Sequence, residues 1–430
     1  MFGFVDLLLL DLATLFVVIQ KRFVANLQQK KRESIRRNSN KILIEFAKFL
    51  QSNKKRQSMI LSIESSCDDS SLALTRIDSR QILFHQKISQ DLSHAKYGGV
   101  VPEVASRLHS VNLPKILQRL SDNFDLRKIR AIAVTTEPGL SVSLLEGVMM
   151  AKALAVSLQI PLIAVNHLQG HIYSLFLEKE AIFPLVILLL SGGHSLIIEA
   201  QSHANLKIIA GTLDDSFGEA FDKVAKMLNL GYPGGVAVES CAKNAVAKNI
   251  TFPIPLQNKD LAFSFSGLKN AVRLKIESII PPPLASGNHQ NSPSLAELQS
   301  SYSPSLAEGA RGWVDSISKS QINEICYGFQ KSAISHIAQK THLYFERKSS
   351  GKSKSTIKHF GVVGGASANL SLRKELQKIA NEFDKTILFA PLEFCSDNAA
   401  MIGRCALESY KCSDFTTLEN LNISPKSTKF

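Results

Sequence analysis

Several features that mark common catalytic sites are missing from this sequence. Its six cysteines include no C-x-x-C pair and no regular spacing, which excludes a disulfide framework and a thiolate zinc site and favours a reducing, cytoplasmic location. No GK[ST] sequence follows a glycine run and no G-x-G-x-x-G opens a helix, so neither a P-loop nor a dinucleotide-binding fingerprint is present. Aromatic residues make up 7% and charged residues 20% of the 430 positions, a composition typical of a soluble α/β protein.

The positive charge is concentrated near the N-terminus. Residues 1–58 hold 12 Lys and Arg against 4 Asp and Glu, so the rest of the chain carries only +5 of the net +13, and charge alone is weak evidence for nucleic-acid binding. The first twenty residues are apolar, but Asp6 and Asp11 would each cost about 2.5–3.5 kcal/mol near a bilayer centre. We therefore expect no membrane anchor. We interpret residues 1–58 as a basic extension, with the hypothesis that translation begins at Met59.

From Met59 onward, short apolar runs alternate with longer helical patterns, which predicts an α/β protein. The length exceeds that of most single cores, so we expect two lobes, 59–165 and 166–392, with a C-terminal helix in 393–430 returning to the first. Residues 281–320 are rich in Pro and Ser and repeat SPSLAE, which predicts a disordered insertion in the second lobe. Strands are predicted at 59–64, 71–76, 81–88, 130–136, 161–166, 183–190, 194–200, 206–212 and 358–364, and helices from about 102 and 141, at 218–229, 236–247 and 321–346, and near 370 and 396.

The segment NHLQGH places His167 and His171 four residues apart, so both imidazoles would lie on one face of a helix at a spacing that suits a metal. Two histidines alone do not complete a site, and such a pair is often incidental. Zinc proteases of the H-E-x-x-H type carry their general base beside the first histidine, where this chain has Leu168. Gln169 cannot replace it, because an amide does not accept a proton at neutral pH. We therefore expect no peptidase.

Glycine-rich turns are predicted at 188–195, 231–235 and 362–369, each after an apolar strand. Glycine lets backbone N–H groups approach an anion closely. Together with the polar hairpin ESSCDDSS at 64–71, these turns predict a phosphate-binding cleft. Cys67 in this hairpin is interpreted as a packing residue, because the neighbouring Asp68 and Asp69 raise the pKa of a thiol and disfavour the nucleophilic thiolate.

Nine ordered motifs between Met59 and about residue 425 resemble the bacterial form of the tRNA N6-adenosine threonylcarbamoyltransferase family, once labelled O-sialoglycoprotein endopeptidases. The motifs are ESSCDDSS, HAKYGGVVPEVASRLH, EPGLSVSL, NHLQGH, LLLSGGHS, DDSFGEAFDKVAKMLNLGYPGG, FSFSGLKNAV, GGASANLSLR and EFCSDNAAM. The resemblance implies the two-lobed fold of actin, Hsp70 and sugar kinases, with the ligand between the lobes.

The resemblance also implies a set of site residues. It assigns His167, His171 and Asp397 as ligands of one divalent metal, with Fe²⁺ expected and Zn²⁺ as the alternative. Asp68 or Asp69 is our candidate for the group that takes the proton from the attacking amine. The adenylate-binding residues carried over are Leu189, Leu190, Ser191, Gly192 and Gly193 of the phosphate turn, Asp222 and Glu239 for the ribose, Gly235 for close backbone approach, and Asn369.

The implied reaction moves a threonylcarbamoyl group from threonylcarbamoyl-AMP to N6 of the adenosine 3′ of the anticodon in tRNAs that read ANN codons. A metal-free paralogue, as heterodimer partner, and a small ATPase are the implied protein partners. Many members have His-His-Met-Glu-Gly-His where this chain has NHLQGH, which puts in doubt any role of that Glu. No chemistry is assigned to His94, Glu103, Arg107 or His109 of the second motif.

Two alternatives remain open. A scaffold-like paralogue would keep the fold but lack the metal ligands, whereas this chain retains all three. A small-molecule kinase of the same superfamily would need an acid poised to deprotonate a hydroxyl and would have no use for the histidine pair.

Overall fold

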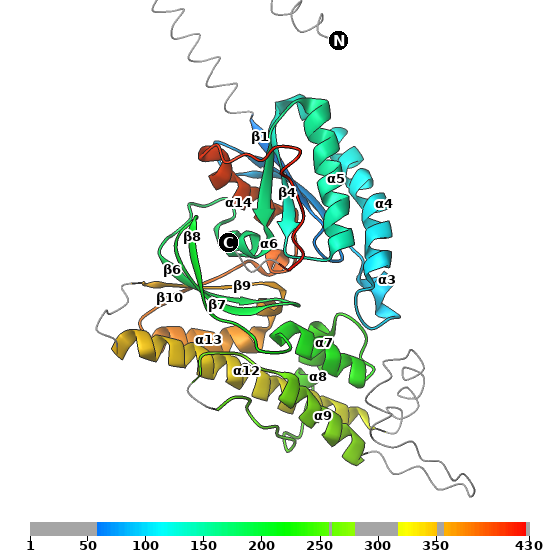
Figure 1. Ribbon diagram of the computed structural model, residues 1–430. Coiled ribbons are helices and arrows are strands. Elements are labelled where there is room, and N and C mark those ends of the chain that lie inside the picture. Colours follow the sequence, from blue (N-terminus) through cyan, green and yellow to red (C-terminus); the bar gives the residue numbers. More distant parts are fainter. Residues whose placement is uncertain (1–57, 258–259, 280–316, 351–356, 427–430) are drawn as a thin grey trace, which may run out of the picture. The chain divides into compact units, whose positions relative to one another are not determined.

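A computed structural model describes residues 58–257, 260–279, 317–350 and 357–426. These residues form two five-stranded sheets, in the orders β3-β2-β1-β4-β5 and β10-β9-β6-β7-β8 (Figure 1). The predicted extension at 1–58 and the predicted insertion at 281–320 lie almost wholly outside the described residues. At the edge of that insertion, Lys319 already belongs to a helix.

The first sheet combines an antiparallel meander with a parallel half. Antiparallel pairing joins β1 to β2 and β2 to β3, and parallel pairing joins β1 to β4 and β4 to β5. The central strand β1 is buried along its whole length, as expected for a strand covered on both faces. The elements are β1 (Met59–Glu64), β2 (Asp69–Arg76), β3 (Ile82–Ser89), α3 (Asp91–Ala95), α4 (Pro102–Ser121), β4 (Ile129–Glu137), α5 (Ser141–Leu158) and β5 (Leu162–Asn166).

The second sheet has the same pattern of pairing around β6. Strand β6 pairs in antiparallel fashion with β7 and in parallel with β9, while β8 and β10 form the edges of the sheet. The elements are β6 (Leu185–Leu190), β7 (Ser195–Ser202), β8 (Asn205–Ala210), α7 (Phe217–Met227), α8 (Gly234–Lys243), α9 (Ser266–Ile279), α12 (Lys319–Ser350), β9 (His359–Val363), α13 (Leu370–Glu382) and β10 (Thr386–Phe389).

Two helices, α6 (His167–Tyr173) and α14 (Ala399–Lys411), lie between the sheets (Figure 1). Alternate residues of a strand face opposite sides, and this alternation sorts β1 and β6 between separate cores. Ile60 of β1 and Ile187 of β6 pack in one core with Leu168 of α6 and Ile402 of α14. The helices α4 and α5 cover the other face of the first sheet, and α7, α12 and α13 that of the second. The layer of α6 and α14 therefore joins the two sheets.

Most predicted strands and helices are confirmed within a few residues. One prediction is wrong: the glycine turn at 231–235 follows helix α7, not a strand. The apolar run before it continues a helical pattern with buried residues at Ala220, Val224 and Ala225, and a glycine after such a run ends a helix as readily as a strand. Helices α3 and α9 and strand β10 are additional to the elements predicted.

Within the described residues, α5 is the one helix long and apolar enough to cross a membrane. Its inner side contributes Leu144, Val148 and Ala151 to the core of the first sheet. It therefore packs as a core helix does.

Candidate metal and nucleotide site

Helix α6 starts where the parallel strand β5 ends. The side chain of Asn166 caps it, because its Oδ1 accepts hydrogen bonds from the backbone N–H of Leu168 at 2.9 Å and of Gln169 at 3.2 Å. Gly170 allows a close approach to α14, since a Cβ there would lie 2.7 Å from Ile402 Cδ1. This cap and this contact fix the helix that carries the two histidines.

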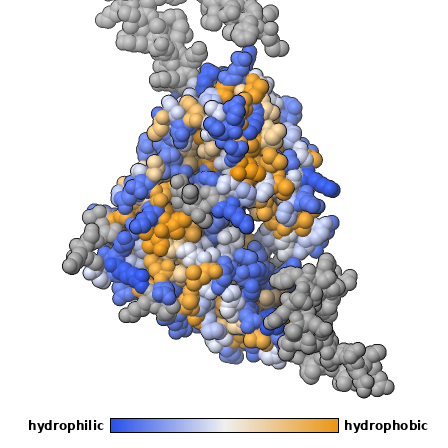
Figure 2. Space-filling view, in the orientation of Figure 1, coloured by the Kyte–Doolittle hydropathy of each residue, from blue (hydrophilic) through white to orange (hydrophobic). Residues whose placement is uncertain are grey.

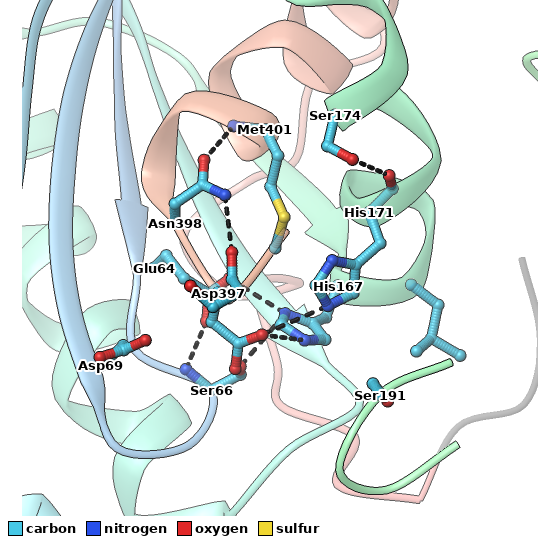
Figure 3. A network of polar contacts seen from close by, with 12 residues as sticks. Glu64, Ser66, Asp69, His167, His171, Ser174, Ser191, Asp397, Asn398 and Met401 are labelled. Carbon is cyan, nitrogen blue, oxygen red and sulfur yellow. Dashed lines mark hydrogen bonds and ion pairs between the residues drawn. The ribbon is translucent and has the colours of Figure 1, made fainter. Parts of the chain in front are cut away.

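Both histidines face Asp397, which comes two residues before α14 begins (Figure 3). Asp397 Oδ1 lies 3.4 Å from His167 Nε2 and 3.2 Å from His171 Nε2. One ligand atom from each of the three residues lies within 4.8 Å of the others. The structure therefore brings together the three residues predicted as metal ligands, from two segments far apart in the chain.

The surroundings of His171 fit a metal site. Its side chain is fully buried, and among the described residues Nδ1 has no hydrogen-bond partner, while Nε2 has only the ion pair with Asp397 at 3.2 Å. A buried polar atom without a partner costs about 1–3 kcal/mol, so such atoms usually mark a function or a missing ligand. Two imidazole nitrogens and one carboxylate form a donor set typical of iron(II) or zinc.

A second group of residues orients His167. Its Nδ1 lies 3.2 Å from Glu64 Oε2 and 3.2 Å from Ser66 Oγ. Glu64 also accepts hydrogen bonds from the Ser66 N–H at 2.6 Å and from Thr135 Oγ1 at 2.5 Å. A carboxylate on the far nitrogen of a ligating histidine fixes the tautomer that leaves Nε2 free for a metal. Glu64 was not among the predicted site residues, although an acid as the last residue of an apolar strand could have indicated a role.

The acids and histidines of this cluster shift one another's pKa. Burial opposes the charged form of His167, but Asp397 and Glu64 outweigh it and raise its pKa well above the usual value. Burial likewise opposes ionisation of Asp397, yet the two histidines lower its pKa well below the ordinary range. For His171, burial and the neighbouring His167 lower the pKa. At neutral pH these shifts favour an ionised Asp397, a neutral His171 and the charged form of His167.

The two candidate proton acceptors are Asp68, at the end of the turn between β1 and β2, and Asp69, the first residue of β2. Lys87 Nζ donates to Asp69 Oδ2 at 2.8 Å and to Ser396 Oγ at 2.9 Å. Burial nevertheless raises the pKa of Asp69 to about 7. Asp68 accepts a hydrogen bond from the Tyr232 hydroxyl at 3.3 Å, which connects this turn to the 231–235 turn. Burial, reinforced by Asp68, raises the pKa of the Cys67 thiol well above its usual value, in agreement with a packing role.

The turn between β6 and β7 has the open backbone expected of a phosphate-binding loop. A Cβ added to Gly192 or Gly193 would meet nothing within 4 Å. Gly218, in the first turn of α7, is tightly packed instead, since a Cβ there would lie 2.6 Å from the Ser191 carbonyl oxygen. The positive N-terminus of α7 is thus held against the glycine turn. Leu189 and Leu190 are fully buried strand residues, so only their backbone could contact a ligand.

The remaining predicted adenylate residues lie on α7, α8 and the β9–α13 connection. Asp222 Oδ1 accepts from the Gly234 N–H at 2.8 Å, and burial raises the pKa of Asp222 to about 6. Glu239 Oε1 accepts from the Leu370 N–H at 2.9 Å. Asn369 caps α13 by accepting from the Leu372 N–H and donates to Gln330. These side chains already take part in local structure, while a Cβ at Gly235 would meet nothing within 4 Å.

Gln169, at the position where many members of the resembled family have Glu, points to a different partner. Its Nε2 donates to the His203 carbonyl oxygen at 2.8 Å. This bond links α6 to the β7–β8 hairpin, so the side chain serves to hold the helix.

Comparison with known proteins identifies relatives along most of the chain. Residues 81–404 match the model of the family TsaD, described as tRNA N6-adenosine threonylcarbamoyltransferase. A protein of that name from Wolinella succinogenes is 53% identical over 370 residues, which cover 86% of this chain and 99% of the relative. Another from Helicobacter pylori (strain ATCC 700392 / 26695) is 53% identical over 375 residues, covering 86% and 98%.

Solved structures show more distant similarity. HypF of T.kodakarensis aligns with a TM-score of 0.49 and 12% identity, over 85% of this chain and 49% of that one. Component A of the (R)-2-hydroxyglutaryl-CoA dehydratase of Acidaminococcus fermentans aligns with a TM-score of 0.43 and 11% identity, over 83% and 99%.

Proposed function

Because this chain belongs to the family of tRNA N6-adenosine threonylcarbamoyltransferases, we propose that His167, His171 and Asp397 hold one divalent metal beside a site for threonylcarbamoyl-AMP. Family membership makes the chain an acyl-type transferase that forms threonylcarbamoyladenosine in tRNA. Its two five-stranded sheets of like pairing agree with the expected fold class of actin, Hsp70 and sugar kinases. The observation that carries the metal proposal is the convergence of three ligand atoms, one from each residue, within 4.8 Å of one another at a fully buried histidine.

Fe²⁺ is the proposed metal and Zn²⁺ the alternative. Two histidines and one carboxylate with open positions form a set typical of non-haem iron(II), while imidazole ligands also suit zinc. When bound, the metal supplies a Lewis acid that can anchor and polarise oxygen atoms of the donor. The protein's own contribution is the fixed arrangement of its ligands, which Glu64 and the Asn166 cap maintain.

The adenylate half of the donor is proposed to lie over the glycine turn at 191–194. The open backbone at Gly192 and Gly193 and the N-terminus of α7 favour a phosphate there. Asp222 and Glu239 are proposed for the ribose hydroxyls. Each already accepts a backbone N–H, but a carboxylate has about four acceptor positions and keeps capacity for more.

In the transfer, the adenosine N6 forms a bond to the carbamoyl carbon, the bond from that carbon to the phosphate oxygen breaks, and AMP leaves with the bonding electrons. The amine must also lose a proton. Asp69 is the proposed acceptor, because its pKa of about 7 suits a general base at neutral pH. Asp68, the residue before it, is the second candidate.

A metal-free paralogue is the proposed partner of the α4–α5 surface, and a small ATPase is proposed as a further component. Val142, Leu145, Met149 and Val156 follow one another at helical spacing along α5, and their side chains are exposed although they are apolar. Figure 2 shows hydrophobic surface among hydrophilic residues in the region of α5. Such a row of exposed apolar side chains on a core helix favours a protein partner.

Reconstitution tests the proposal. Purified chain, paralogue, ATPase, unmodified tRNA and threonylcarbamoyl-AMP are combined, and the nucleosides are analysed by mass spectrometry. We expect modified adenosine with the wild type and its loss with His171→Ala, while His342→Ala, a half-exposed histidine on α12, leaves it unchanged. Full activity of the folded His171→Ala protein without bound metal would overturn the metal role.

A further inference from the structure

A buried chain of polar groups runs through the motif HAKYGGVVPEVASRLH, to which the proposed function gives no role. Gln90, His94, His109 and Ser70 are each at most 2% exposed. Val101 N lies 3.3 Å from His94 Nδ1, and His94 Nε2 lies 3.1 Å from Gln90 Oε1. The chain continues from Gln90 Nε2 to Ser70 Oγ at 3.4 Å, from Ser70 Oγ to His109 Nδ1 at 2.8 Å, and from His109 Nε2 to the Cys67 carbonyl oxygen at 2.9 Å.

The groups at the two ends of this chain of hydrogen bonds determine which nitrogen of each histidine ring donates to or accepts from them. The Val101 backbone N–H can only donate, so His94 Nδ1 accepts and His94 Nε2 carries the proton that it donates to Gln90. At the other end the Cys67 carbonyl can only accept, so His109 Nε2 also carries a proton. In the neutral ring, His109 Nδ1 accepts from the Ser70 hydroxyl, which in turn accepts from the Gln90 amide.

This arrangement is that of two neutral rings. A proton added to His94 Nδ1 would face the Val101 N–H, and one added to His109 Nδ1 would reverse the bond to Ser70. Burial lowers the pKa of His109, in the direction that the arrangement requires.

This chain of hydrogen bonds ends on the β1–β2 turn, which faces the proposed metal ligands. Cys67 lies between Ser66, whose hydroxyl is 3.2 Å from His167 Nδ1, and Asp68, which accepts from Tyr232. The β1–β2 turn has only four residues. The His109 ring, on α4, donates a hydrogen bond to the backbone of this turn at Cys67. A shift of the Cys67 carbonyl would therefore move Ser66 and Asp68 together.

We propose that His94 and His109 are positioning residues. Through one chain of hydrogen bonds between neutral groups, they hold the β1–β2 turn in place beside the metal ligands. Neither side chain touches the reacting groups in this role. The expected effect on transfer rests on the proposed site, whereas the protonation pattern can be measured without any activity.

Long-range ¹H–¹⁵N correlation spectra of the full-length protein with labelled histidine test the pattern directly. We expect both His94 and His109 to have a proton on Nε2 and none on Nδ1. A proton on Nδ1 of either ring would overturn the proposal. Because this measurement uses the wild type, it does not depend on whether a variant folds.

Substitutions at His109 test the consequence for transfer. Leucine removes the donor to Cys67, and we expect kcat to fall by about 10- to 100-fold, as for other small misplacements of reacting groups, with little change in KM for tRNA. Glutamine can still donate from Nε2 and should restore most of kcat. His336→Leu, at an equally buried histidine between Phe263 and Phe265, is the matched control and should leave kcat unchanged.

Two results would contradict the positioning role. One is an unchanged kcat in a folded His109→Leu protein. The other is a His109→Gln protein that is as slow as the leucine variant, since the effect would then not follow the hydrogen bond to Cys67. Wild-type activity in the same assay shows separately whether the proposed function itself holds.

Discussion

Replacement of Glu64 by glutamine separates the metal ligands from the residue that orients them. The side chain keeps its size, but it exchanges an acceptor oxygen for an amide donor. In the wild type, Glu64 accepts from the Ser66 N–H through Oε1 and from Thr135 and His167 through Oε2. Either orientation of the amide disturbs one of these two groups.

If the amide NH₂ replaces Oε1, it faces the Ser66 N–H, and two buried donors lose their partner at a cost of about 1–3 kcal/mol. If it replaces Oε2, the Thr135 hydroxyl can rotate to accept, but His167 Nδ1 must accept as well. The proton of the neutral ring then lies on Nε2, the nitrogen that faces Asp397 and would bind the metal. The favoured tautomer of His167 would therefore compete with metal binding.

Loss of such an outer partner typically lowers metal affinity by about 10- to 100-fold, which corresponds to roughly 1.4–2.7 kcal/mol. We expect this decrease for Glu64→Gln in a competition titration of Zn²⁺ against a coloured chelator, and also for Fe²⁺ under anaerobic conditions. Glu408→Gln is the control, because it removes a carboxylate bound to the buried Arg404 in α14, away from His167. Equal affinity of wild type and Glu64→Gln would refute the orienting role.

Three further outcomes are expected. Activity should rise as the pH passes about 7, because Asp69 must lose its proton to act as a base, and Asp69→Asn should lower kcat and abolish this rise in a pH–rate profile; an unaltered profile would exclude Asp69. Leu145→Asp should abolish the heterodimer in gel filtration without changing the melting temperature by more than a few degrees. The control Lys152→Asp, on the same helix, should leave the heterodimer intact. Gly218→Ala should raise KM for threonylcarbamoyl-AMP and destabilise the fold by about 1–3 kcal/mol, since its Cβ meets the Ser191 carbonyl; Gly267→Ala, with free space around it, should do neither.

Local sequence patterns predicted the parts of the site that depend on neighbouring residues. The i, i+4 spacing was sufficient to place His167 and His171 on one face of a helix, because helical geometry is set within a turn. Asp397 was different. Nothing in its own surroundings distinguishes it from other acids, and it was assigned only through resemblance to a family, since its approach to the histidines depends on the packing of α14 against α6.

Sequence patterns did not predict the partners of residues that act through buried hydrogen bonds. In the sequence, Glu64 is only the last residue of an apolar strand. Its hydrogen bond with His167 requires the parallel arrangement of β1, β4 and β5. The chain through His94 and His109 likewise joins α3, α4 and β2, which meet only in the folded protein. For Asp222 and Asn369, the structure adds bonds to Gly234 and Leu372 that hold the local backbone.

The histidine pair lies in the layer between the two sheets, so both sheets influence the geometry of the site. Helix α6 continues from β5 of the first sheet and packs through Leu168 and Ile172 in the same core as Leu189 of the second. Asp397 precedes α14, whose Met401 and Ile402 lie in that core as well. The three proposed ligands are therefore fixed by the layer that both sheets share. A change in the relative position of the sheets would alter the distance from Asp397 to the histidines, so metal geometry and the arrangement of the sheets depend on each other.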